Sequence, residues 1–257
     1  MFMNKIMGRK VNSQNSAPIE ADPVDKLFRD GVFDPQNLPQ LPVELSFMPD
    51  GWMSELELRL LYSLGRDSQG DFLEIGPWIG RSTTAIALGR RDGGAGTRRF
   101  DTVDYGFVSL SDFCEALNTG IGYASNDEIA RPVLGNGGSI AYLIENLRKR
   151  SLLPQITSII RGNALEAPLR ESYSVIFCDA VHSEHEIGLT GPLLAKLARP
   201  GSWLVCDDIH VDAKLVAALE EHLQFESLIL LGEYDAASKA AFGRVRSTSV
   251  HPAVPAR

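Results

Sequence analysis

The chain has 257 residues and a net charge of −8, with 44% hydrophobic and 23% charged residues. This length is sufficient for one α/β domain with a full core and an added segment. The acidic balance speaks against a nucleic-acid partner, no apolar run approaches the ~20 residues of a membrane span, and the three cysteines lack metal or redox spacing, so we expect a cytoplasmic protein.

Residues 1–50 are rich in Pro, Asn, Gln and Asp and show little periodicity. We interpret them as an N-terminal arm that is partly disordered, with a short helix at 23–29. The arm could instead pack on another subunit of a homo-oligomer, and the sequence does not decide between these alternatives. The folded domain is expected over residues 51–246, followed by a flexible tail at 247–257.

The first regular element of the domain is a helix that begins after Ser54. Ser54 is suited to cap this helix, and Glu57 three residues later completes a capping box. The apolar positions that follow have helical spacing: Leu56, Leu58, Leu60, Leu61 and Leu64.

Strands and helices then alternate. Strands are expected at 72–75, 99–104, 156–161, 173–178 and 203–206, and helices at 81–90, 183–198 and 212–222. Gly191 and Pro192 predict a break or a kink in the second of these helices. Residues 105–153 form an insertion, helical over 139–150, of the kind that builds lids or substrate walls.

The end of the chain departs from this alternation. Two strand-like runs, 227–231 and 240–245, are joined by a segment with little room for a helix. We therefore expect a terminal hairpin. The whole pattern predicts an α/β fold with a Rossmann-like, doubly wound, seven-stranded and mostly parallel sheet whose last strand is antiparallel.

The most informative stretch is DFLEIGPWIGRSTT, residues 71–84. A short apolar strand ends in a glycine turn with G-x-x-x-G spacing (Gly76, Gly80), and a helix opens at Ser82 and Thr83. Such a turn brings backbone N–H groups and a helix N-terminus close to a ligand. The spacing differs from the dinucleotide motif G-x-G-x-x-G. With Glu74 two residues before the first glycine, it resembles motif I of class I methyltransferases that use S-adenosylmethionine (SAM).

Polar residues follow the other strands as well. Asp104 follows the second strand, Asn163 the third, Asp179 and His182 the fourth, and Asp207 with Asp208 the fifth. Ligands of open α/β sheets bind at this edge. Any one of these acids alone would be explained as a solvated turn residue. Together with the motif I loop, they favour a binding site.

The resemblance implies a role for each residue near SAM. Asp104 is placed to accept hydrogen bonds from both ribose hydroxyls, by the logic of nicotinamide enzymes. Glu74 resembles the motif I acid that organises the loop of Gly76, Gly80, Ser82 and Thr83. Asn163 matches the position near the adenine amino group, although an Asx turn explains this residue equally well. Asp179 is expected to face the donor too.

Asp179, Asp207 and Asp208 are expected to converge, because the fourth and fifth strands are neighbours in this topology. Three close carboxylates repel one another unless a positive group lies between them. No Lys or Arg occurs at 175–182 or 200–210. A divalent cation such as Mg²⁺ therefore suits the site. The alternative is that Asp208 caps the next helix while Asp207 contacts SAM.

The runs VIFCDAVH (175–182) and PGSWLVCDD (200–208) resemble the metal-dependent O-methyltransferases of natural-product pathways, such as the macrocin-type sugar enzymes. This resemblance covers roughly residues 51–246. It implies that Asp179, Asp207 and Asp208 hold the metal and that His182 is the base. Many relatives read Asp-Gly-Asp-His here, whereas Val181 replaces the second acid in this chain.

These observations predict a SAM-dependent O-methyltransferase, with Mg²⁺, that acts on a small-molecule hydroxyl such as a sugar diol, a catechol-like ring or a natural product. His182 would take the proton while Asp179 holds the metal, with His210 as an alternative base and His185 as a surface residue. A metal-free methyltransferase acting on O, N or C and a non-catalytic SAM-fold protein stay open. A nicotinamide oxidoreductase is disfavoured by the glycine spacing and the hairpin.

Overall fold

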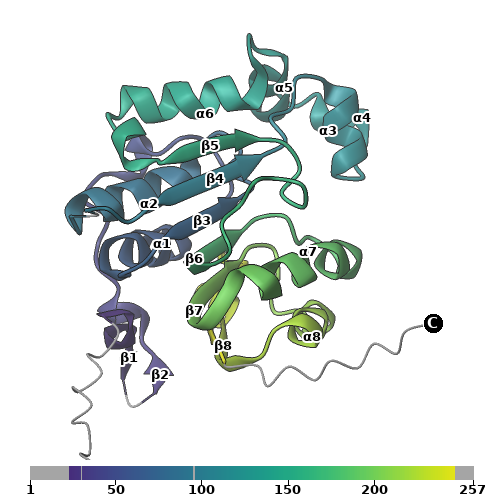
Figure 1. The fold of residues 1–257 in the computed structure, drawn as a ribbon. Helices are drawn as coiled ribbons and strands as arrows, with labels where there is room; N and C mark the ends of the chain where they lie inside the picture. The colour runs from purple at the N-terminus through teal and green to yellow at the C-terminus, as the bar shows by residue number, and fades with distance from the viewer. Residues whose placement is uncertain (1–22, 30, 95, 247–257) are drawn as a thin grey trace, which may run out of the picture.

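The computed structural model describes residues 23–29, 31–94 and 96–246. Seven strands of this part of the chain form one sheet in the order β5-β4-β3-β6-β7-β9-β8 (Figure 1). Neighbouring strands are parallel except that β9 is antiparallel to both β7 and β8. The predicted doubly wound sheet with an antiparallel last strand is therefore confirmed. The strands are β3 (Phe72–Ile75), β4 (Phe100–Asp104), β5 (Ser158–Arg161), β6 (Tyr173–Cys178), β7 (Ala198–Cys206), β8 (Phe225–Leu230) and β9 (Ala241–Val245).

Helices cover both faces of the sheet. One face carries α1, α2 and α6, and the other carries α7 and α8 (Figure 1). The helices are α1 (Glu55–Asp67), α2 (Arg81–Asp92), α3 (Leu110–Ala116), α4 (Ile121–Ala124), α5 (Asp127–Leu134), α6 (Gly138–Lys149), α7 (Glu184–Leu197) and α8 (Ala213–His222).

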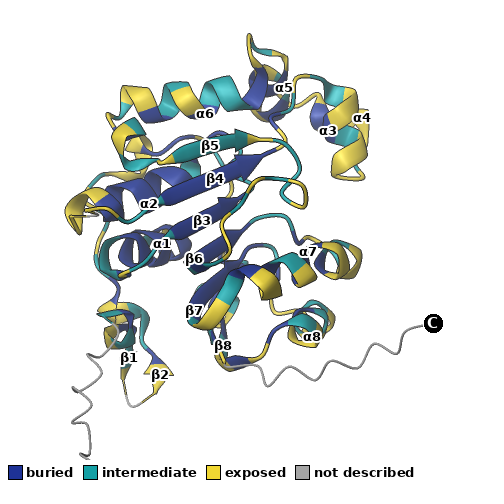
Figure 2. Ribbon diagram, in the orientation of Figure 1, coloured by how far each residue is buried: buried dark blue, intermediate teal, exposed yellow. Residues whose placement is uncertain are grey.

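Successive side chains of a strand point to opposite faces of the sheet, and helices cover both faces, so the central strands are buried on both sides. Phe72 packs into the cluster beneath α1 and α2, while Leu73 packs into the cluster beneath α7 and α8. The same alternation runs through Phe177 and Cys178 of β6. Figure 2 shows the result: the central strands β3, β4 and β6 are buried along almost all of their length, whereas the edge strand β5 is only half-buried. The apolar runs that predicted these strands are thus explained by two-sided packing.

The insertion between β4 and β5 holds α3 to α6, and α6 confirms the helix expected at 139–150. Helix α6 packs on the sheet through Leu143 and Leu147. Helices α3 to α5 lie beyond the carboxyl ends of β4 and β5 (Figure 1) and are held by a small cluster of their own: Phe113, Ala124, Ile129 and Val133. The insertion is therefore placed over the edge where a ligand is expected.

Of the break or kink predicted in the helix at 183–198, the break is wrong, because α7 continues through Pro192, and the kink stays a prediction. The ring of Pro192 removes one hydrogen bond to the carbonyl group of Gly188, and this residue is exposed, so water can replace the lost donor. Gly191 has a separate role, because a Cβ atom there would overlap the ring of His222 on α8. The Gly-Pro pair therefore serves helix packing.

Residues 23–50 pack against the domain. A 3-10 helix at Pro23–Leu27 is followed by the short hairpin of β1 (Phe28–Arg29) and β2 (Val32–Phe33), so the helix expected at 23–29 is shorter and of another type. Phe28 stacks on Trp203 and packs at a tilt against Phe242. Further 3-10 turns are Pro35–Asn37, Leu45–Phe47, Leu153–Gln155 and Leu231–Glu233.

The disorder predicted for the start of the arm and for the tail falls on residues 1–22 and 247–257, outside the described residues. The boundary between arm and domain stays a prediction. Among the described residues, no helix combines the length and apolar character that crossing a membrane requires.

Candidate active site

The loop after β3 lies directly against the end of β6. Gly76 has a φ of +83°, and a Cβ atom there would stand 2.5 Å from the carbonyl oxygen of Asp179. Only glycine fits both conditions. Gly80, with a φ of +100°, then caps the start of α2. The two glycines of the predicted motif thus bring the backbone of this loop to the edge of the sheet, next to the end of a neighbouring strand.

Glu74 fastens β3 to the first turn of α2. Its buried carboxylate accepts hydrogen bonds from the hydroxyl groups of Ser82, at 2.6 Å, and Thr83, at 2.8 Å. Burial raises the pKa of Glu74 to about 7, against the effect of these donors. Since both hydroxyl protons are directed at Glu74, Ser82 and Thr83 present their backbone N–H groups to a ligand at the helix start.

Asp104 ends β4 beside the same loop. Its carboxylate accepts hydrogen bonds from the N–H groups of Gly106, at 2.6 Å, and Trp78, at 3.3 Å. Burial raises its pKa to about 6. Trp78 has a φ of +50°, which is unusual for a residue with a side chain. The carboxylate expected to receive ribose hydroxyls is therefore held in place by two backbone donors.

A pocket of about 200 Å³ opens between the loops that follow β3, β4, β5 and β6. It brings together four of the residues predicted to contact SAM, Gly76, Asp104, Asn163 and Asp179, and the predicted base His182. The side-chain oxygen of Asn163 accepts a hydrogen bond from the N–H group of Leu165 at 3.0 Å, which is an Asx turn. The turn and the predicted contact are compatible, because the Asn163 amide nitrogen has no part in this bond.

A second pocket of about 420 Å³ adjoins the first and shares Gly76, Asp104, Asp179 and His182 with it. One side of it carries aromatic side chains from the segment before α1, from the glycine loop and from the insertion: Trp52, Trp78, Phe107, Phe113 and Tyr123. The acids after β7 and Lys239 also line it. The two pockets therefore meet at the acids that follow β4 and β6.

His182 lies between two carboxylates. Its Nε2 atom is 3.6 Å from Oδ1 of Asp179 and 3.4 Å from Oδ2 of Asp208. Contact with Asp179, aided by the charges of Asp208 and Glu186, raises the pKa of His182 to about 9. One donor atom from each of Asp179, His182 and Asp208 lies within 4.8 Å of the others. Two carboxylates and an imidazole at this separation fit a divalent cation.

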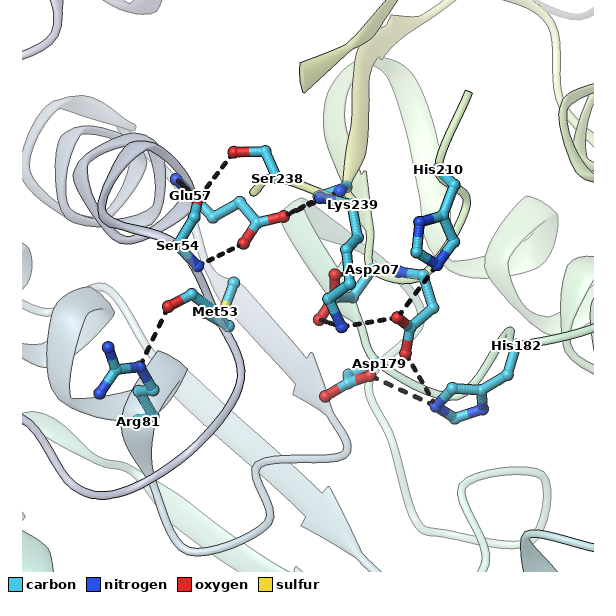
Figure 3. A network of polar contacts seen from close by, with 12 residues as sticks. Met53, Ser54, Glu57, Arg81, Asp179, His182, Asp207, His210, Ser238 and Lys239 are labelled. Carbon is cyan, nitrogen blue, oxygen red and sulfur yellow. Dashed lines mark hydrogen bonds and ion pairs between the residues drawn. The ribbon is translucent and has the colours of Figure 1, made fainter. Parts of the chain in front are cut away.

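Asp207 takes a different place from the one expected of a metal ligand. It is only 2% exposed, and its carboxylate accepts the backbone N–H of Asp208 at 2.9 Å. The ammonium group of Lys239 lies 3.6 Å from Asp207 and 2.6 Å from Asp208 (Figure 3). Burial raises the pKa of Asp207, and this ammonium acts against that effect. The positive group that was not found near these acids in the sequence is thus Lys239.

Lys239 was missed because it is remote in sequence from the acids it contacts. The hairpin itself contained the signal. In the antiparallel pairing of β7 and β9, Cys206 faces Ala241. The residues after β7 must therefore lie beside the residues before β9, and Asp207 and Asp208 come close to Lys239. The predicted strand boundaries, combined with this register, would have located it.

The other two histidines that the sequence places near the site, His185 and His210, line neither pocket. Nε2 of His210 is 3.7 Å from Oδ1 of Asp208, and the residue has a φ of +53°. His185 lies in the first turn of α7 and is exposed. Of the three histidines, His182 alone lines both pockets.

Comparison with known proteins gives one family. A family model described as a methyltransferase domain matches residues 73–209, more than half of the chain. No curated protein matches.

Solved structures are similar at low identity. The O-methyltransferase TomG from Streptomyces achromogenes, involved in tomaymycin synthesis and solved with SAM, is 19% identical over 77% of this chain and 83% of its own, with a TM-score of 0.47. The methyltransferase PaMTH1 from Podospora anserina, bound to SAH, is 18% identical over 79% and 81%, with a TM-score of 0.49. An O-methyltransferase from Bacillus cereus, in complex with SAH, is 18% identical over 82% and 86%, with a TM-score of 0.44.

Proposed function

Because this chain belongs to the methyltransferase-domain family, we propose that it transfers the methyl group of SAM to a hydroxyl oxygen of a small molecule. The family and the order of the sheet confirm the predicted class, a class I SAM-dependent methyltransferase. One observation carries the rest of the proposal. Two adjoining pockets share Asp104, Asp179 and His182, so a donor and an acceptor would meet at these side chains.

The smaller pocket is proposed to hold the donor. Asp104 and Asn163 both line it. Asp104 would accept hydrogen bonds from the two ribose hydroxyls of SAM, and Asn163 would lie near the adenine of SAM. The glycine loop, closed by Glu74, would lie along the methionine end with its backbone N–H groups. In this arrangement the hydroxyl groups of Ser82 and Thr83 keep their hydrogen bonds to Glu74, and only their backbone N–H groups would face SAM.

The larger pocket is proposed to hold the acceptor. Its volume of about 420 Å³ suits a small molecule, and its walls combine aromatic side chains with the acids of the site. Aromatic side chains stack on flat rings and on the apolar faces of sugars. A sugar diol, a catechol-like ring and a natural product that carries either group therefore remain the acceptor classes. In each, a hydroxyl would have to reach His182 at the junction of the pockets.

A divalent cation is part of the proposal. Asp179 and Asp208 are the residues that would hold it, which leaves Nε2 of His182 free for the proton, and Asp207 would support Asp208 through the backbone N–H contact. When bound, such a cation lowers the pKa of a coordinated hydroxyl and orients it. A metal-free reaction is the second candidate, and Lys239 favours it, because this ammonium already offsets part of the negative charge.

His182, in its neutral form, is proposed to take the proton of the acceptor hydroxyl at Nε2, the atom that lies between Asp179 and Asp208. The charge of a bound cation would favour this neutral form, because it opposes the carboxylates that raise the pKa of His182. Asp179 and Asp208 would orient the ring, and Glu186, 3.2 Å from Nδ1, would fix it from the other side. The acceptor oxygen would then take the methyl carbon from sulfur in line, leaving S-adenosylhomocysteine. Holding the two substrates together supplies much of the rate.

The proposal is tested by calorimetric titration of the purified protein with SAM and with NAD, and then by incubation with methyl-labelled SAM and a panel of sugars and catechols. We expect SAM to bind, NAD not to bind, and label to enter at least one hydroxyl compound. Chelator treatment separates the two candidates, because it stops the reaction only if a cation is required. Absence of SAM binding would refute the proposed function as a whole.

A further inference from the structure

Lys239 is held in the site by a contact from the other end of the domain. The backbone N–H groups of Lys239 and Ala240 both donate to one carboxylate oxygen of Glu57, at 2.5 and 2.9 Å. The second oxygen of Glu57 accepts the N–H of Ser54 at 2.7 Å, which completes the capping box of α1. Glu57 is 1% exposed. The helix cap therefore also fixes the chain just before β9.

A second contact supports the first. The hydroxyl groups of Ser54 and Ser238 lie 2.6 Å apart (Figure 3). A capping box needs only residues of its own helix, so these bonds to residues 238–240 are additional. The bonds from Glu57 and Ser54 hold the backbone of residues 238–240 in place. The side chain of Lys239 extends from this backbone toward Asp207 and Asp208.

The charges around this ammonium decide what it does. Asp179, Asp207 and Asp208 carry three negative charges when ionised, and Lys239 offsets one of them. The raised pKa of His182 makes its ring a second positive group beside these acids while no cation is bound. A bound divalent cation would repel that proton, and the two negative charges that remain match its own charge. Its Nζ atom contacts Oδ1 of Asp208, and this carboxylate is also one of the two that would hold the cation. An ammonium and a cation at the same carboxylate repel each other.

We propose that Lys239 is the built-in counter-ion of this acid cluster and sets the affinity of the site for divalent cations. This proposal rests on the cation site of the proposed function. While no cation is bound, the charge of Lys239 reduces the repulsion between these carboxylates in the folded protein. When a cation is present, Lys239 weakens its binding by competing for the carboxylate of Asp208. Glu57 acts as a positioning residue, because it holds the backbone from which Lys239 extends.

The test is a calorimetric titration of the full chain with Mn²⁺, without acceptor. Lys239→Met removes the charge but keeps an unbranched side chain, and we expect it to bind Mn²⁺ about tenfold more tightly or better, the order expected for removing one charge a few ångströms away. Lys239→Arg keeps the charge and should stay within about threefold of the wild type. Lys196→Met, on the exposed far end of α7, is the matched control and should change nothing.

Equal Mn²⁺ affinities for wild type and Lys239→Met would overturn the proposal. Lys239→Gln, which is also uncharged, serves as a second variant if the methionine protein does not fold. If neither the wild type nor any variant binds Mn²⁺, this proposal and the cation of the proposed function are both wrong. A SAM titration of the same samples tests the methyl-donor site separately. If SAM still binds, the proposed methyl transfer stands although the cation proposal fails.

Discussion

Glu57 accepts a hydrogen bond at 2.5 Å from the backbone N–H of Lys239, a residue 182 positions later in the chain. This bond joins the first turn of α1 to the hairpin strand β9. One carboxylate thereby satisfies the N–H groups of Ser54, Lys239 and Ala240. The start of the domain and its last strand are consequently fixed relative to each other beside the acids of the site.

The Glu57→Ala variant should be destabilised strongly. It leaves three backbone donors without their partner, and the region around Ala240 is buried, so water cannot easily replace the carboxylate. We expect a loss of about 3 kcal/mol in the free energy of unfolding. Urea denaturation followed by circular dichroism measures it. Glu55→Ala, in the same helical turn but exposed, should change the free energy of unfolding by less than about 0.5 kcal/mol.

Glu74 makes stability depend on pH. Burial raises its pKa from 4.5 to about 7 in the folded protein, so the folded state holds a proton that the unfolded state releases earlier. The contribution is fully present below pH 4.5 and is lost as the pH rises toward 7. Integrated over that window, it is on the order of 3 kcal/mol.

Glu74→Gln tests this link because the amide keeps the shape of a protonated carboxyl. The free energy of unfolding of the wild type should fall relative to that of the variant between pH 4.5 and 7, and the difference should level off above this range. Urea titrations at a series of pH values give both curves. Parallel curves for the two proteins would show that Glu74 does not titrate there.

Asp104 is expected to control donor affinity without affecting the cation. Asp104→Asn replaces a charged acceptor that faces the donor pocket, and we expect SAM to bind about ten- to a hundredfold more weakly by calorimetry. Mn²⁺ affinity should stay unchanged, because Asp104 is not among the cation-holding residues. The exposed Asp112→Asn on α3 is the control. Normal SAM binding by Asp104→Asn would remove Asp104 from the donor site.

The fold and part of the site could be predicted from the sequence because they depend on local features. Strand ends are local features, and parallel strands place all their carboxyl ends at one edge, so Asp104 and Asp179 could be assigned to one site from spacing alone. Contacts that depend on register between distant segments could not. Lys239 and its tie to Glu57 required the pairing of β7 with β9. The continuous α7 was missed because local breaker residues were outweighed by packing against α8.

His182 and His210 are distinguished by their positions. His182 lines both pockets, with Nε2 between Asp179 and Asp208, whereas His210 lies outside both pockets and its ring is near Oδ1 of Asp208, the oxygen that Lys239 also contacts. With whichever acceptor of the panel is methylated, His182→Gln should lower kcat by about a hundredfold or more, the usual range for loss of a general base. SAM affinity should change little. His210→Gln should keep kcat within about threefold of the wild type, because its ring does not reach the junction where the hydroxyl must lie. Single-turnover rates with labelled SAM measure the chemical step directly, and a larger loss in the His210 variant would move the role of base to that residue.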